Sequence, residues 1–204
     1  AAPPDPADPE FVCPIGHFCP AGSAVPSECP GGRFGATTGL TRASCTSTCP
    51  SGHYCARGTT DGAPTGQASD PSRRPARRCA AGTYNPLAGG ESDANCLTCP
   101  VAAFCGEATS LPVSCATHFG RSGVPAKHLS AAAGSEAAAD CRCLPGYYDS
   151  SGDPDARSCV VCPPAADCVA DGLTTTSLPV KVMNWRASSG SLLILRKVCR
   201  TKPG

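Results

Sequence analysis

Apolar residues form only short runs along this chain, and polar or turn-forming stretches separate them. The longest apolar run, "LLIL" at 192–195, has the length of a strand, and no run reaches the 18 residues of a membrane-spanning helix. Elsewhere single aromatic residues follow Cys-x-x-Gly, and stretches such as "NPLAGGESDAN" at 85–95 are typical of turns. The pattern predicts short two-stranded β ribbons and turns.

Two segments add to this picture. The Ala-rich "LSAAAGSEAAAD" at 129–140 suits a short helical turn. Near the end of the sequence, "SLPVKVMNWRAS" at 177–188 and "SLLILRKVC" at 191–199 predict two β-strands around the turn "SSG".

A repeat of cysteines organises the chain into half-units, most of which begin Cys-x-x-Gly-x-aromatic. In a long half-unit the next cysteine follows after about 15 residues, and in a short half-unit after five. The long half-units are 29–45, 79–96 and 143–159, the short ones are 13–19, 49–55, 99–105 and 162–168, and 115–141 is a degenerate long one. The glycine permits a positive φ in a tight turn, and the aromatic can cover a cystine.

The repeat predicts a succession of small modules. We expect a Pro/Ala-rich lead at 1–10, a partial repeat at 11–28, a repeat with an Arg-rich insertion loop at 29–78, a repeat at 79–114, a degenerate half-repeat at 115–142, a repeat at 143–170, and a β-rich segment at 171–204 that starts a further domain. Because the first repeat lacks its long half, we expect this sequence to be part of a longer protein.

Composition explains how modules of this size could hold together. Leu, Ile, Val and Phe supply 29 of the 204 residues, about 14%, which is below the share that usually builds a core. Seventeen cysteines indicate disulfides instead, and a disulfide that closes a loop of about 15 residues contributes roughly 3 kcal/mol. Because disulfides persist in oxidising compartments, we expect an extracellular or cell-surface location. The net charge of +1 favours binding to neither nucleic acid nor an anionic membrane, so we expect no nucleic-acid partner. We also expect no membrane insertion of this segment, because no apolar run is long enough.

Two disulfide schemes fit the spacing, and the sequence alone does not distinguish them. An interlocked scheme would join, for example, Cys79 to Cys99 and Cys96 to Cys105. We favour sequential pairing, because the chain contains an isolated short half-unit and an isolated degenerate one. Sequential pairing predicts Cys13–Cys19, Cys29–Cys45, Cys49–Cys55, Cys79–Cys96, Cys99–Cys105, Cys115–Cys141, Cys143–Cys159 and Cys162–Cys168. Cys199 is left over, and we expect it to pair beyond residue 204 or with another chain.

The sequence gives little support for a metal site or a redox site, and we expect neither enzymatic activity nor a cofactor. Zinc could use Cys96 with Cys99, Cys159 with Cys162, and the histidines His17 and His53, but no histidine recurs in the later copies. Cys-x-x-Cys redox catalysis needs a larger α/β fold, which the pattern does not predict. The run "DSSGDPD" at 149–155 could bind calcium, but its spacing differs from an EF-hand loop, so we favour a solvated turn.

The run "CPGGRFGATTGLTRASCTSTCPSGHYC" at 29–55 resembles the ephrin-receptor-like cysteine-rich repeat, whose spacing overlaps with tumour-necrosis-factor-receptor-like and epidermal-growth-factor-like modules. The stretches 79–105 and 143–168 look like further copies, so the resemblance covers about 12–170. Ala102 replaces the expected glycine and Asp167 the expected aromatic, and we expect the cystines to preserve the fold at both places. The stretch 172–199, with Trp185 and Arg186 before a Ser-rich turn, is similar to the segment that follows such repeats in surface proteins of algae and other protists.

The resemblance implies a large extracellular protein, such as a flagellar filament, flagellar hair or cell coat. We expect tandem modules in an elongated array, acting as a structural or adhesive spacer that contacts neighbouring modules, other protein chains and possible O-glycans. The alternative is a ligand-binding receptor ectodomain, and its candidate contacts are Arg73, Arg74, Arg77, Arg78, Phe119 and Trp185. "RRPARR" could also be a protease-processing or polyanion-binding site, although a solvated loop is the simpler interpretation.

Overall fold

The structure, a computed structural model, describes residues 12–63, 73–119, 129–153, 156–181, 184–186 and 194–196. The chain divides into two compact units, which we describe separately. Unit 1 consists of Ala1–Cys99 and Cys105–Pro112, and unit 2 of Pro100–Phe104 and Val113–Gly204. The boundary between the units therefore falls in the short half-unit that begins at Cys99.

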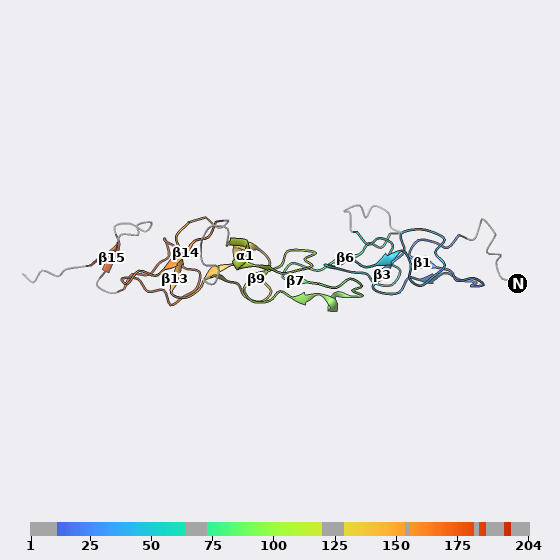
Figure 1. The fold of residues 1–204 in the computed structure, drawn as a ribbon, viewed down its shortest axis with the longest axis horizontal. Helices are drawn as coiled ribbons and strands as arrows, with labels where there is room; N and C mark the ends of the chain where they lie inside the picture. Colours follow the sequence, from blue (N-terminus) through green and yellow to red (C-terminus); the bar gives the residue numbers. More distant parts are fainter. Residues whose placement is uncertain are drawn as a thin grey trace, which may run out of the picture. The chain divides into compact units, whose positions relative to one another are not determined.

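In the described residues seven of the eight half-units form a two-stranded antiparallel ribbon, as the sequence pattern predicts (Figure 1). The short half-unit at 162–168 has only an isolated bridge between Ala166 and Val180. Except in the degenerate half-unit, the first strand follows the Cys-x-x-Gly turn or, after Cys99, the turn at Ala102, and the second strand ends at or beside the first cysteine of the next half-unit. In unit 1 the pairs are β1 (His17–Phe18) with β2 (Ser27–Glu28), β3 (Arg33–Phe34) with β4 (Ser47–Thr48), β5 (His53–Tyr54) with β6 (Arg77–Arg78), and β7 (Thr83–Tyr84) with β8 (Leu97–Thr98).

Unit 2 continues the same pattern. Its pairs are β9 (Ala103–Phe104) with β10 (Val113–Ser114), β11 (Leu129–Ser130) with β12 (Arg142–Cys143), β13 (Tyr147–Asp149) with β14 (Cys159–Val161), and β15 (Asn184–Arg186) with β16 (Ile194–Arg196). The residues after the second cysteine of a short half-unit are thus part of that half-unit, because they supply its second strand. The strands expected near Trp185 and Leu195 are confirmed, and these two residues lie opposite each other.

The turn glycines have the left-handed backbone that the repeat predicts. Gly16 has a φ of +74°, and a Cβ added there would lie 2.7 Å from the carbonyl oxygen of Gly58. Ala102 takes the same conformation, with a φ of +61°, although an L-residue adopts it at a cost. The fold at this departure from the repeat is therefore kept, as expected.

Cysteines form most of the interior. In both units the fully buried side chains of largest volume are all cysteines, and the repeat aromatics Phe34, Tyr54 and Tyr84 are half-buried beside them. The largest hydrophobic cluster lies in unit 2, where Phe119 and Leu129 pack around Cys115, Cys141, Cys143 and Cys159. The structure thus agrees with a core built on disulfides rather than on apolar side chains.

Three short helices interrupt the ribbons in the described part of the chain: α1 (Cys115–Phe119) and the 3-10 turns η1 (Asp93–Asn95) and η4 (Ala138–Asp140). The pattern predicted a helical turn in the Ala-rich segment, where η4 lies, but not α1. The two 3-10 turns are held alike. Asn95 Oδ1 accepts the backbone N–H groups of Glu91 and Ser92, and Asp140 Oδ2 accepts those of Glu136 and Ala137.

Candidate functional site

The eight disulfides of the structure follow the sequential scheme. The sixth residue after the first cysteine of a half-unit accounts for the alternation of short and long loops. In a short half-unit this residue is a second cysteine, which closes onto the first. In the long half-units it is Gly35, Asn85 or Asp149, so the first cysteine pairs with a later one. Cys199 lies outside the described residues.

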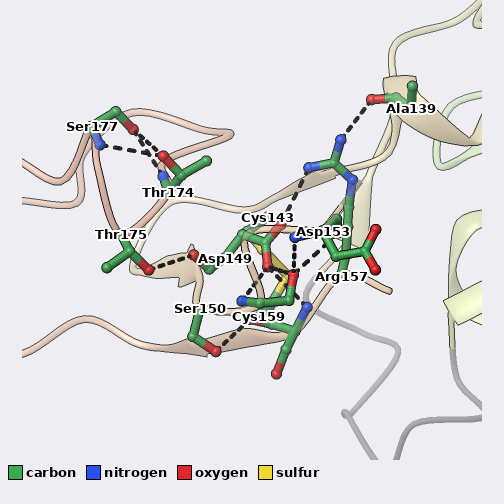
Figure 2. Close-up of polar contacts among 12 residues, drawn as sticks. Ala139, Cys143, Asp149, Ser150, Asp153, Arg157, Cys159, Thr174, Thr175 and Ser177 are labelled. Carbon is green, nitrogen blue, oxygen red and sulfur yellow. Dashed lines mark hydrogen bonds and ion pairs between the residues drawn. A yellow bond between two sulfur atoms is a disulfide. The ribbon is translucent and has the colours of Figure 1, made fainter. Parts of the chain in front are cut away.

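Asp149 is the centre of the most extensive polar cluster of unit 2 (Figure 2). Its side chain is buried, with 5% exposed. Oδ1 accepts the backbone N–H groups of Ser151 and Ser158, each at 3.0 Å, and the hydroxyl of Ser151 at 2.7 Å. Oδ2 faces the guanidinium of Arg157 at 3.4 Å. The carboxylate therefore closes the loop of its half-unit from inside.

Arg157 connects this cluster to the neighbouring half-unit at 115–141. Its Nη2 donates to the carbonyl of Ala139 at 3.0 Å, as Figure 2 shows. Its Nε is buried and has no hydrogen-bond partner among the described residues. The ion pair is largely sequestered from water, so it fixes the loop more firmly than a surface pair would.

Ser151, Gly152 and Asp153 of the run "DSSGDPD" are exposed, as the interpretation of a solvated turn predicts, whereas the Asp149 cluster at the start of the run is buried. It also does not resemble a calcium site. Cation ligands must direct free oxygen lone pairs at the ion, whereas Asp149 already accepts four donors. Within the described ranges, no group of three or more His, Cys, Asp or Glu side chains could hold a metal ion.

The two histidines of the short half-units have a structural role. His17 Nδ1 lies 3.0 Å from the carbonyl oxygen of Ile15, and His53 Nδ1 lies 3.0 Å from that of Ser51. Both residues are half-buried. Each ring thus holds its Cys-Pro-x-Gly turn. The cysteines of the zinc hypothesis, Cys96, Cys99, Cys159 and Cys162, are all oxidised to disulfides.

The Arg-rich run is largely built into the fold of unit 1. Arg77 and Arg78 form β6, and Arg78 pairs with Glu107 at 3.5 Å. Arg74 pairs with Glu28 at 3.4 Å, and its carbonyl accepts the N–H of Thr60 at 2.8 Å. Arg73 is exposed where the described segment begins. Because the backbone from 74 to 78 is bonded to neighbouring segments, it does not have the free, extended form that a processing protease binds.

Two aromatic residues, Phe119 and Trp185, are candidate ligand contacts, and the structure shows that one of them is buried. Phe119 is 4% exposed and packs in the cystine cluster of unit 2, with its ring 4.7 Å from that of His118. Its burial corrects the hypothesis that it is a surface contact. The signal that could have revealed this is its place in the degenerate half-unit, where the repeat aromatic is otherwise missing. Trp185 lies in β15, opposite Leu195.

The chain matches no protein-family model and no curated protein sequence. No helix of the described residues has the length and apolar character that crossing a membrane requires. The geometry described above is that of disulfide-closed loops. Buried polar contacts stabilise these loops, and backbone hydrogen bonds connect them to one another.

Proposed function

We propose that this chain is a disulfide-stapled spacer of a large extracellular or cell-surface protein, such as a filament, flagellar hair or cell coat. The observation that carries the proposal is the joining of successive half-units by backbone hydrogen bonds. For example, the N–H of Gly32 donates to the carbonyl of Cys55, and the N–H of Gly58 donates to that of Cys29. Such bonds orient each half-unit on the next, which a spacer needs and a flexible linker lacks.

Eight disulfides in about 200 residues suit an oxidising environment, and they support an extracellular location. A receptor ectodomain is less well supported, because binding hot spots are usually exposed aromatic or Arg side chains. Phe119 is buried, and Arg74 and Arg78 pair with acidic neighbours. The resemblance to ephrin-receptor-like repeats agrees with either role.

Mechanical extension of the full chain between two handles tests the spacer. The cystines enclose roughly half of the chain, so the intact protein should resist unravelling, and reduction should lengthen the fully extended chain by about 300 Å. The oxidised protein is the matched control. Equal extended lengths before and after reduction would contradict the proposal.

Location is tested separately, by labelling source cells with an antibody against the folded chain. We expect intact cells to be labelled on surface structures. Labelling that appears only after permeabilisation would place the chain inside the cell and exclude the spacer role.

A further inference from the structure

Unit 1 carries a local excess of arginine. The sequence between 49 and 78 contains five arginines, two aspartates and no lysine or glutamate. The arginines are Arg57, Arg73, Arg74, Arg77 and Arg78. A guanidinium group can donate two parallel N–H groups to the oxygens of a sulfate, phosphate or carboxylate, which an ammonium group cannot do. This part of the chain is therefore suited to anionic groups, although the net charge of the whole chain is only +1.

Two of these arginines share one carboxylate. Arg74 Nη1 lies 3.4 Å from Glu28 Oε1, and Arg57 Nε lies 3.9 Å from Glu28 Oε2. We call these three residues the Glu28 cluster. One negative charge cannot neutralise two guanidinium groups, so the cluster retains a positive charge.

The Glu28 cluster is open to solvent. The side chains of Arg57 and Arg74 are 73% and 67% exposed, and that of Glu28 is 40% exposed. Among the described residues the guanidinium group of Arg57 donates no hydrogen bond, and that of Arg74 donates only to Glu28. Most N–H donors of the two guanidinium groups therefore face water and are available to a ligand.

The backbone that carries the two arginines is fixed by hydrogen bonds. The N–H of Thr60 donates to the carbonyl of Arg74, and the N–H of Arg74 donates to Thr60 Oγ1, both at 2.8 Å. Directly after Arg57, the N–H of Gly58 donates to the carbonyl of Cys29 at 2.9 Å. A ligand would thus order only side chains, which keeps the entropic cost of binding low.

Arg77 adds a third cation close to the cluster. It lies three residues after Arg74, so the two Cα atoms are within about 10 Å of each other. Arg77 is exposed in β6 and forms no ion pair within the described part of the chain. The aspartate of the same described segment, Asp61, is half-buried, and its Oδ1 accepts the N–H of Ala63. The three arginines therefore lie on an exposed surface with a surplus of positive charge.

We propose that the Glu28 cluster, together with Arg77, is a binding site for a sulfated polysaccharide. Sulfate oxygens accept N–H groups from guanidinium, and one polymer chain can contact all three arginines at once, which raises its total affinity. Exposed charges suit a hydrated polyanion, whereas a protein ligand needs hot spots that become buried. The inference goes beyond the spacer function and rests on the proposed extracellular location, because it is there that such polymers occur.

The test measures binding of the full, oxidised chain to dextran sulfate by titration calorimetry. Uncharged dextran of the same length is the matched ligand, because it differs only in lacking sulfate. We expect binding to dextran sulfate and none to dextran. The affinity should fall as the salt concentration rises from about 50 to about 500 mM, because salt screens exposed charges.

Variants locate the site on the surface. Arg57→Gln combined with Arg74→Gln should lower the affinity for dextran sulfate by about tenfold or more, because two charged donors are lost. The matched control combines Arg42→Gln with Arg142→Gln, which removes two other exposed arginines, and should change the affinity by less than about twofold. Thermal unfolding of each variant checks that the fold is kept.

Glu28→Gln gives a result of the opposite sign. It removes the carboxylate that competes with sulfate for the two guanidinium groups, so the affinity for dextran sulfate should rise by about threefold. A mere pair of structural salt bridges would show no such gain.

The proposal is overturned if dextran sulfate does not bind, or if the two double variants lose affinity equally, since only the net charge would then matter. Tighter binding to vesicles that contain phosphatidylserine than to dextran sulfate would also overturn it, because the ligand would then be a membrane surface. These outcomes are independent of mechanical extension and of cell labelling, which decide the spacer function and the location.

Discussion

Backbone conformation at single residues determines how closely the half-units approach one another. Gly16 and Gly22 both have a positive φ, but their surroundings differ. A Cβ at Gly16 would meet the Gly58 carbonyl oxygen, whereas a Cβ at Gly22 would meet nothing within 4 Å. An alanine at Gly22 would therefore meet only the conformational cost of a positive φ, whereas an alanine at Gly16 would meet that cost and a steric clash.

We expect Gly16→Ala to lower the free energy of unfolding of unit 1 by about 3 kcal/mol, because it adds a steric clash to the cost of a left-handed alanine. Gly22→Ala is the control and should cost only about 1 kcal/mol. Urea denaturation of the oxidised proteins measures both. Equal losses would show that the Gly58 carbonyl moves aside without cost.

The second residue-scale prediction concerns the buried pair of Asp149 and Arg157. Arg157→Ala should destabilise unit 2 by about 3 kcal/mol, because it leaves a buried carboxylate without its cation. The double variant Asp149→Asn with Arg157→Ala should recover part of this loss, since Asn85 occupies the equivalent position without a cation. Thermal or urea unfolding compares the three proteins. A double variant no more stable than Arg157→Ala alone would contradict this account.

At the scale of elements, a 3-10 turn precedes the second cysteine in two of the long loops. Each turn is stabilised by local hydrogen bonds to one side-chain oxygen and not by a hydrophobic core. In η4 the backbone N–H groups of Ala137 and Glu136 hold the pKa of Asp140 below its usual value of 3.8. The turn η1 achieves the same bonds with the neutral amide of Asn95. One turn should therefore respond to acid and the other should not.

The lowered pKa gives Asp140 a stabilising contribution that is fully present above the unfolded value of 3.8 and is lost as the pH falls through the lower native value. Asp140→Asn, which reproduces Asn95, should keep the hydrogen bonds and flatten the acid dependence of stability in this range. Urea denaturation between about pH 2 and pH 7 tests this expectation. An unchanged slope would show that Asp140 does not contribute.

At the scale of the whole molecule, stability depends on covalent closure more than on apolar burial. Loop-closure entropy predicts that loss of the Cys115–Cys141 cystine costs about 3.5 kcal/mol and loss of Cys49–Cys55 about 2 kcal/mol, because the first loop is longer. The cysteines of both pairs are fully buried, so the contrast is one of loop length.

We therefore expect a reductant to abolish the cooperative thermal transition of the chain, and a chelator to leave it unchanged. Circular dichroism during heating, with each additive separately, measures this. A fold that survives reduction but is lost with the chelator would contradict the disulfide account and favour a metal.

The sequence by itself determined the half-units, their ribbons and their dependence on cystines, because cysteine spacing and turn glycines are local features. It also showed where the C-terminal strands lie. It did not determine the disulfide scheme, since sequential and interlocked pairing enclose loops of comparable length. Only the tertiary structure decided this, and with it the burial of Phe119 and Asp149 and the backbone hydrogen bonds between half-units. Each of these depends on contacts between residues of different half-units or across a whole loop, and a side chain's exposure follows from what packs on it rather than from its neighbours in sequence.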